Sequence, residues 1–153
     1  MIRHGNPPHL ECSSRGDARF SAFYARLRSY GNRSIEAIYQ AAKVFGDGST
    51  GLTWRQAKGR ACINADEVRK LYGQLWDAYI AENPELERVL KQASGLSDMF
   101  GQPGHACQAT ELWRIRQRLL DRDAMADSQG VQSTAPAPRA VIRVPAPRWR
   151  SKP

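Results

Sequence analysis

The chain has no long apolar segment and few cysteines, and each absence narrows its class. No run approaches the roughly 18 consecutive apolar residues that a membrane span needs, and residues 1–8 lack the apolar core of a signal peptide. We therefore expect a cytoplasmic protein with no membrane partner. The three cysteines are widely spaced, at Cys12, Cys62 and Cys107. An odd, scattered set predicts reduced thiols rather than a disulfide framework.

Motifs for metal binding, phosphate binding and nucleophilic catalysis are also missing. The close pair His105 and Cys107 has no second pair beside it, whereas structural zinc usually takes four ligands in two close pairs. No Gly-x-Ser-x-Gly occurs, and the glycine-rich residues 46–51 are not followed by Gly-Lys-Ser/Thr. A lone His105 in a loop is better explained as structural or solvated than as catalytic. We expect neither a metal nor a cofactor.

What the chain does contain is enough for one domain and a tail. It has 153 residues, of which 41% are hydrophobic and 25% charged, as in ordinary globular proteins. Residues 1–18 predict an irregular lead-in, residues 19–126 a single mainly helical domain, and residues 127–153 a disordered tail rich in proline and arginine.

The basic character of the chain is concentrated in this tail. The net charge is +8, and residues 128–153 hold five basic residues and no acidic one, which leaves +3 for the remainder. A basic arm can bind nucleic acid or an acidic surface. Five charges over 26 residues are a modest density, however, which favours a soluble tail without such a partner.

Hydrophobic periodicity predicts a mainly α fold, a compact bundle of about five helices with one or two short strands. A short basic helix is expected within residues 53–60, and a capping-box pattern at Asn64 marks the start of a longer one. The alternating aromatic residues 19–24 predict a short strand or an extended segment. The other helices are predicted from Ser34 to Gly46, from Asn64 past Tyr79, from Pro84 to Gly95, and from about Ala109 to Met125.

The helix that follows Ser34 carries a second pattern beside its apolar face. Glu36, Gln40 and Lys43 fall at i, i+4 and i+7, which aligns an acid, an amide and an amine. Such a stripe on a helix that packs into a core can line a pocket. It can equally form a solvated face with a favourable ion-pair spacing. Periodicity leaves both interpretations open.

A second carboxylate, Asp98, lies beside Phe100 in the glycine-rich residues 95–104. Two carboxylates near aromatic walls suit glycosidic hydrolysis, because one stabilises a cationic sugar or polarises water while the other handles protons. Each also has a simpler explanation: the helix dipole favours an acid at Glu36, and Asp98 is a turn-forming residue. Spacing in the sequence does not show whether the two meet.

Four segments resemble, in order, motifs of the NADAR superfamily of N-glycosidases. These are an aromatic Ser-Asn-Phe-Tyr segment, a Val-Glu-His-Tyr-Tyr-Gln-Ala-x-Lys helix, a Lys-Phe-x-Gln-Asn-Pro-x-Leu motif and an Asp-x-x-Trp-Gly-x-Gly loop. The counterparts are residues 21–24, 35–43, 81–86 and 98–104. The chain has Ala22, Ala37 and Phe100 where the family has asparagine, histidine and tryptophan. It thus resembles a divergent member, active or inactive, and also small uncharacterised proteins of bacteria and their phages.

The resemblance implies a cofactor-independent hydrolase that cleaves the C–N glycosidic bond of a ribosyl or ADP-ribosyl nucleotide-type substrate. In that case Glu36 would orient water or stabilise the ribosyl cation, and Asp98 would assist. The remaining substrate-binding residues that it implies are Gln40 on the same helix stripe, Lys43 and Arg60 for phosphate, and Tyr24, Trp54 or Phe100 to stack on a base.

An alternative function is a non-enzymatic module that binds nucleic acid or a protein. Residues 54–60 combine a tryptophan with three basic residues, a composition that suits single-stranded nucleic acid, and the basic tail would extend the contact. An exposed helix anchored by Trp54 explains the same residues. The sequence leaves open whether the chain is an enzyme, which substrate it takes and whether it forms oligomers.

Overall fold

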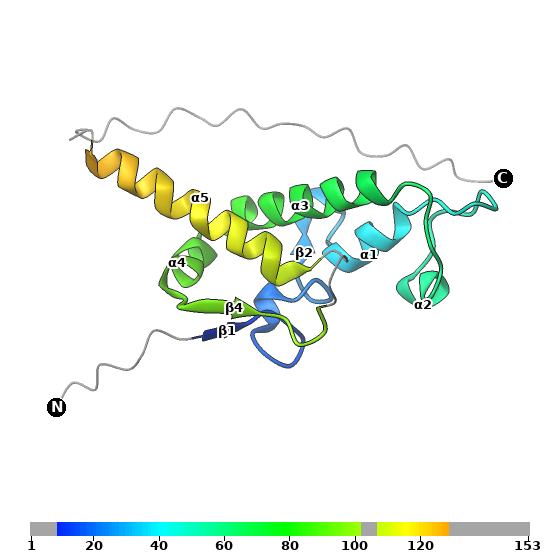
Figure 1. Cartoon of the computed structure of the whole chain (residues 1–153), viewed down its shortest axis with the longest axis horizontal. Helices are drawn as coiled ribbons and strands as arrows, with labels where there is room; N and C mark the ends of the chain where they lie inside the picture. The colour runs from blue at the N-terminus through cyan, green and yellow to red at the C-terminus, as the bar shows by residue number, and fades with distance from the viewer. Residues whose placement is uncertain (1–8, 102–106, 129–153) are drawn as a thin grey trace.

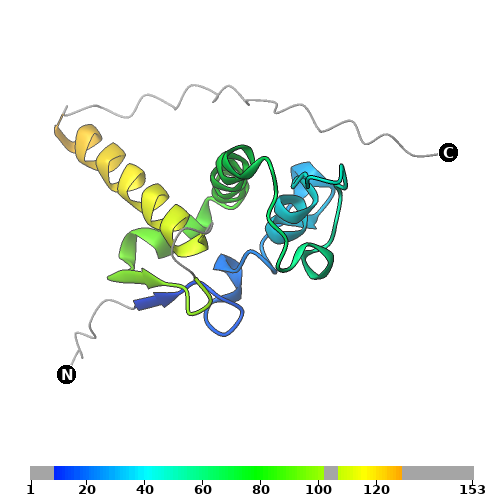
Figure 2. The ribbon, with the colours of Figure 1, turned by 45° about the vertical axis from the view of Figure 1, so that its right-hand side comes forward.

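The computed structural model describes residues 9–101 and 107–128 (Figure 1). Five α-helices dominate this part of the chain, which confirms the predicted mainly α class. The two long helices, α3 (Ala65–Glu82) and α5 (Gln108–Ser128), pack against each other. Figure 2 shows α5 on one side of α3 and the short helices α1 and α2 on the other. The predictions for residues 129–153 and for His105 lie outside the described residues.

Helix α1 (Ile35–Ala41) begins where the sequence predicts and ends earlier. Ser34 Oγ accepts a hydrogen bond of 3.1 Å from the Ala37 N–H, so serine caps the first turn. Beyond Ala42 the backbone is held by Asn64, whose Oδ1 accepts from the Val44 N–H at 2.9 Å and whose Nδ2 donates to the Ala42 carbonyl at 3.0 Å. The Asn64 side chain therefore ties α1 to α3, and it does not form the capping box that the sequence predicts.

The next helices follow local capping signals. Helix α2 (Trp54–Ala57) has a capping box, in which Thr53 Oγ1 accepts from the Gln56 N–H and Gln56 Oε1 accepts from the Thr53 N–H. It is shorter than the predicted segment 53–60, because Gly59 turns the chain with φ of 73°. Helix α4 (Glu85–Gln92) starts just after Pro84 and packs against α5.

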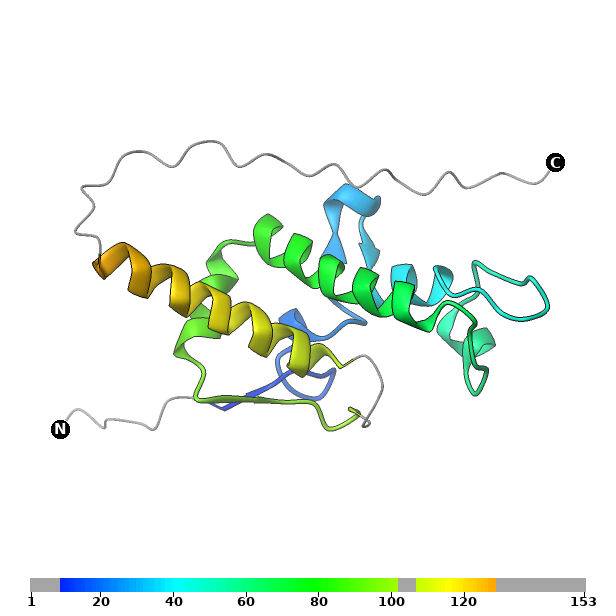
Figure 3. The same ribbon diagram turned by 45° about the horizontal axis from the view of Figure 1, so that its top comes forward.

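Four short strands form two separate pairs. Strand β1 (His9–Glu11) runs parallel to β4 (Gly95–Ser97), and β2 (Arg26–Leu27) runs antiparallel to β3 (Arg33–Ser34). The second pair contacts α3 on the side away from α5 (Figure 3). The predicted lead-in thus contains a strand, and Leu10, Cys12 and Ser13 within it are buried.

The aromatic residues 19–24 form no strand, contrary to the prediction. Their first half is a 3₁₀ turn, η1 (Ala18–Phe20), because Asp17 accepts a hydrogen bond from the Arg19 N–H and starts a tight turn. Phe20 is buried by this turn, whereas Phe23 and Tyr24 lie on the surface. Phe20, Ser21 and Ala22 are buried in succession, so the alternation in the sequence does not correspond to alternating burial.

The core is centred on the middle of α3. Trp76 is fully buried, and the rings of Tyr39, Tyr72, Trp76 and Tyr79 meet edge to face, with centroids 4.9, 6.4 and 5.6 Å apart in that order. Fully burying one large apolar side chain stabilises a fold by about 1.5–3 kcal/mol. No helix among the described residues is long and apolar enough to cross a membrane. The largest fully buried apolar side chains in the cluster around Trp76 are Phe20, Leu27, Ile35, Leu75, Ile80, Leu90, Leu112 and Ile115.

The loop after β1 has no room for a side chain at Gly16. A Cβ atom there would lie 2.2 Å from the Glu11 carbonyl oxygen and 2.5 Å from the Glu11 Cβ. We expect Gly16→Ala to lower the free energy of unfolding by about 1–3 kcal/mol, as overpacking does, measured by urea denaturation. Gly46→Ala is the matched control, because a Cβ at Gly46 meets nothing within 4 Å. Equal stability of the two variants would contradict the expected clash.

Candidate functional site

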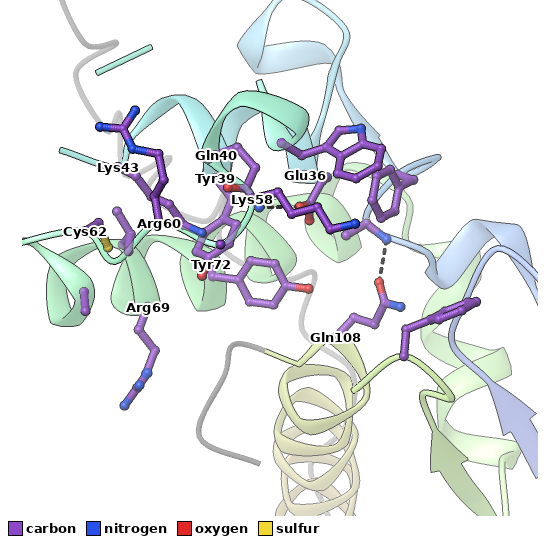
Figure 4. Close-up of a pocket in the computed structure, with 18 of the residues that line it drawn as sticks. Glu36, Tyr39, Gln40, Lys43, Lys58, Arg60, Cys62, Arg69, Tyr72 and Gln108 are labelled. Carbon is purple, nitrogen blue, oxygen red and sulfur yellow. Dashed lines mark hydrogen bonds between the residues drawn. The ribbon is translucent and has the colours of Figure 1, made fainter. Parts of the chain in front are cut away.

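One cavity of about 1000 Å³ lies between α1, α2, α3 and the start of α5 (Figure 4). We call it the main cavity. Seven of the eight residues that the sequence analysis singles out line it: Glu36, Gln40, Lys43, Trp54, Arg60, Asp98 and Phe100. Tyr24 is not among its lining residues, and its side chain is exposed to solvent. The fold therefore gathers residues from four separate segments around one space.

The polar stripe of α1 lies on the wall of the main cavity. Gln40 Nε2 donates a hydrogen bond of 2.6 Å to Glu36 Oε1, one helical turn away. Lys43 continues the stripe and places its Nζ 4.7 Å from the centre of the Tyr39 ring. The opposite face of α1 buries Ile35, Ile38 and Ala41 in the core. The apolar face fixes α1, which presents Glu36 and Gln40 to the cavity, and the turn after α1 adds Lys43.

Glu36 is the half-buried acid of the cavity. Burial raises the pKa of its carboxyl group, while the hydrogen bond from Gln40 and the positive charge of Lys43 act in the opposite direction. Its backbone N–H donates to the Ala22 carbonyl at 2.9 Å, which anchors the start of α1 to the segment before β2. A carboxylate whose pKa is raised in a cavity is a stronger base than an exposed carboxylate, which suits it to proton transfer.

Asp98 lines the same cavity from the loop after β4. Its Oδ1 accepts a hydrogen bond of 2.9 Å from the Phe100 N–H, so the turn-forming explanation applies to this residue. Its Oδ2 accepts from the Cys107 thiol at 3.8 Å, which places Asp98 next to the first residue of α5. The carboxylate thus shapes its own loop while it borders the cavity.

The basic residues of the cavity come from the turn after α1, from α3 and from the chain after α2. Arg60 is engaged elsewhere: its Nη2 binds Asp47 and Ser49 at 3.0 and 3.1 Å, and its guanidinium lies 4.2 Å from the centre of the Phe45 ring. Lys58 and Arg69 also line the cavity and were not singled out from the sequence. The basic pattern of residues 53–60 was the available signal for Lys58.

Aromatic rings border the opening near α2. The rings of Trp54 and Phe23 meet edge to face, with their centroids 5.9 Å apart. The Arg55 guanidinium lies over the Trp54 ring, 5.5 Å from its centroid. Trp54 is 40% exposed and Phe100 is 56% exposed. Both aromatic side chains therefore keep surface available to a bound molecule.

Tyr72 and Gln108 are cavity residues that sequence reasoning missed. Tyr72 belongs to the apolar face of α3, yet Figure 4 shows its hydroxyl directed toward the space between Glu36 and Gln108. Burial raises the pKa of Tyr72, so its hydroxyl stays protonated. Gln108 Oε1 accepts a hydrogen bond of 2.6 Å from the Ala22 N–H. No sequence pattern marks Gln108, because its bond spans 86 residues.

Two buried polar atoms at the cavity wall have no hydrogen-bond partner within the described part of the chain. They are Ser21 Oγ and Gln40 Oε1. A buried polar group left unpaired costs about 1–3 kcal/mol. Such a cost is tolerated where a ligand or an ordered water completes the hydrogen bond.

Metal ligands do not gather at the cavity. Among residues 9–101 and 107–128, no group of three or more His, Cys, Asp and Glu side chains is placed to hold a metal ion. Cys12, Cys62 and Cys107 are free thiols, and burial raises the pKa of Cys12 to about 12. The polar groups that the described residues bring to the cavity are carboxylates, amides, hydroxyls and cations.

The raised pKa of Glu36 makes a prediction about stability. Because the folded-state pKa lies above the unfolded one, Glu36 destabilises the fold increasingly as pH rises from the ordinary glutamate range through the folded pKa. We expect Glu36→Gln to raise the melting temperature at pH 7, with a gain that disappears at pH 3.5 where both states are protonated. Thermal melts of both proteins between pH 3.5 and 8 test this, and a pH-independent difference would contradict it.

Known proteins provide no template for the main cavity. The chain matches no protein-family model, no curated protein and no solved structure.

Proposed function

We propose that the main cavity binds a phosphorylated N-riboside and hydrolyses its C–N glycosidic bond. The observation that carries this proposal is the half-buried Glu36, held by Gln40 at 2.6 Å on the wall of a cavity that also holds cations and exposed aromatic rings. The ordered resemblance of four segments to N-glycosidase motifs supports the same reaction class. In this resemblance, α1, which carries Glu36, corresponds to the family's Val-Glu-His-Tyr-Tyr-Gln-Ala-x-Lys helix.

The reaction is the net addition of water across the glycosidic bond. The bond between the anomeric carbon and the base nitrogen breaks, and its electron pair leaves with the base. Water oxygen bonds to the anomeric carbon and one water proton passes to Glu36. Glu36 then releases this proton to the departing base nitrogen or, for a pyridine base that leaves neutral, to solvent. Glu36 stabilises the cationic ribosyl group in the transition state and accepts the water proton. Burial of Glu36 strengthens it as a base.

Recognition is assigned to the cations and the rings of the cavity. Lys43 and Lys58 supply positive charge to a phosphate, because charged hydrogen bonds to phosphate are strong and short. Trp54 and Phe100 offer exposed faces on which a base can stack. A volume of about 1000 Å³ is at the upper end of ordinary ligand sites, which accommodates a nucleotide-sized molecule.

Glu36→Gln tests the catalytic role. We expect hydrolysis of purine, pyrimidine and pyridine nucleoside 5′-monophosphates to fall by about 10²–10⁴-fold in kcat, since a positioned acid–base group contributes this much. Release of the free base, followed by liquid chromatography, measures it. Glu85→Gln is the matched control, because Glu85 is exposed on α4 and does not line the cavity. Retained turnover in Glu36→Gln would remove Glu36 from the mechanism.

Nucleic-acid binding is a second candidate function. The stacked pair of Arg55 and Trp54, with the tryptophan 40% exposed, forms a surface of the kind on which single-stranded bases stack. Lys58 follows one turn later in the chain and adds positive charge. Trp54 and Lys58 also line the main cavity, so a strand bound there would pass over its opening.

Truncation after Asp127 distinguishes this second function. If the chain binds nucleic acid through the α2 segment and its tail, the truncated protein and Trp54→Ala both bind a single-stranded DNA oligonucleotide at least about tenfold more weakly. The slope of log K against log salt would fall only in the truncation, by about 0.7 for each lost phosphate contact. Fluorescence anisotropy at several salt concentrations measures both quantities, and unchanged values exclude the binding role.

A further inference from the structure

We propose that Gln108 recognises the leaving base, and that the substrate lies in the main cavity with its base at the Gln108 end and its phosphate at the Lys43 end. This inference rests on the proposed function and extends it to substrate orientation and specificity. It follows from how the Gln108 amide is held and from how charge is distributed along the cavity.

The Gln108 side chain has one bonded end and one available end. It is 7% exposed and lines the cavity. Oε1 must be the atom that faces the Ala22 N–H, 2.6 Å away, because only the carbonyl end of an amide accepts a hydrogen bond. Within residues 9–101 and 107–128, no atom accepts a hydrogen bond from Nε2 of Gln108. A neutral N–H donor is therefore fixed in orientation at the cavity wall.

The two ends of the cavity differ in charge. Figure 4 shows Lys43, Arg60 and Arg69 on one side, Gln108 on the other, and Glu36, Tyr72 and the Lys58 side chain between them, so three of the four cations lie away from Gln108. Asp98 borders the Gln108 end, because its Oδ2 contacts the Cys107 thiol next to Gln108 in the chain. A phosphate is attracted to the cationic side and repelled by Asp98. The neutral base of the substrate then occupies the Gln108 end.

This orientation places the scissile bond beside Glu36, between the two ends. It also selects for the base. The Gln108 Nε2 donates to a base that presents a carbonyl oxygen or a ring nitrogen as acceptor, and a base without one loses this hydrogen bond. A site built around a hydrogen bond discriminates against partners that leave its polar group unpaired.

Binding of two phosphorylated ligands tests the assignment. The two ligands are ribose 5-phosphate and a nucleoside 5′-monophosphate whose base carries a carbonyl group. Calorimetry measures the binding of each ligand to wild type, Gln108→Glu and Lys43→Gln. Gln108→Glu keeps an oxygen for the Ala22 N–H and replaces the donor by an acceptor. We expect it to weaken nucleotide binding about tenfold and to leave ribose 5-phosphate binding unchanged. Lys43→Gln should weaken both ligands alike.

Ser14→Glu is the charge control, because Ser14 is exposed and lines the same cavity. A selective loss of nucleotide binding in Ser14→Glu, an equal loss of both ligands in Gln108→Glu, or no loss in Gln108→Glu would each overturn the assignment.

If Gln108→Glu does not fold, Gln108→Met removes the donor without adding charge, and its ribose 5-phosphate binding reports an intact cavity. Failure of wild type to bind or hydrolyse any of these ligands overturns the proposed function and this inference together. Hydrolysis by wild type with unaltered Gln108→Glu binding overturns only this inference.

Discussion

The backbone of Ala22 is the point on which the architecture of the cavity depends. Its carbonyl accepts from the Glu36 N–H at 2.9 Å, and its N–H donates to Gln108 Oε1 at 2.6 Å. Ala22 is buried, so both groups would be costly to leave unpaired. One residue thereby fixes the first turn of α1 relative to the first turn of α5. The side chains that emerge from these two turns, Glu36 and Gln108, face one cavity as a result.

The aromatic series along α3 connects this cavity to the core. Tyr39 and Tyr72 line the cavity and meet each other edge to face, and Tyr72 continues the contact to the fully buried Trp76. Lys43 rests over the outer ring of this series. A cation and a tyrosine hydroxyl are thus positioned by rings that are themselves immobilised by packing. The rigid part of the fold extends to the wall where a substrate would bind.

Stability and function oppose each other at the cavity wall. Glu36 is a half-buried acid whose pKa is raised, and Ser21 Oγ and Gln40 Oε1 are buried polar atoms without partners among the described residues. Each of these costs folding free energy, and the apolar core around Trp76 offsets that cost. Two of the three buried polar atoms without a partner among the described residues lie at this cavity, and the third, Trp76 Nε1, lies in the core.

The sequence by itself determined the helical class, most helix positions and the stripe of Glu36, Gln40 and Lys43, because periodicity and capping act over a few residues. It did not determine the strand at residues 9–11, since a three-residue strand is defined by its partner β4 and not by its own pattern. It did not show that Asp98 shares a cavity with Glu36, or that Gln108 belongs there at all. Contacts across tens of residues, such as the bond from Gln108 to Ala22, leave no periodic trace in the chain. Only the tertiary structure decided that the polar stripe lines a cavity, because packing of the opposite face of α1 sets where the stripe points.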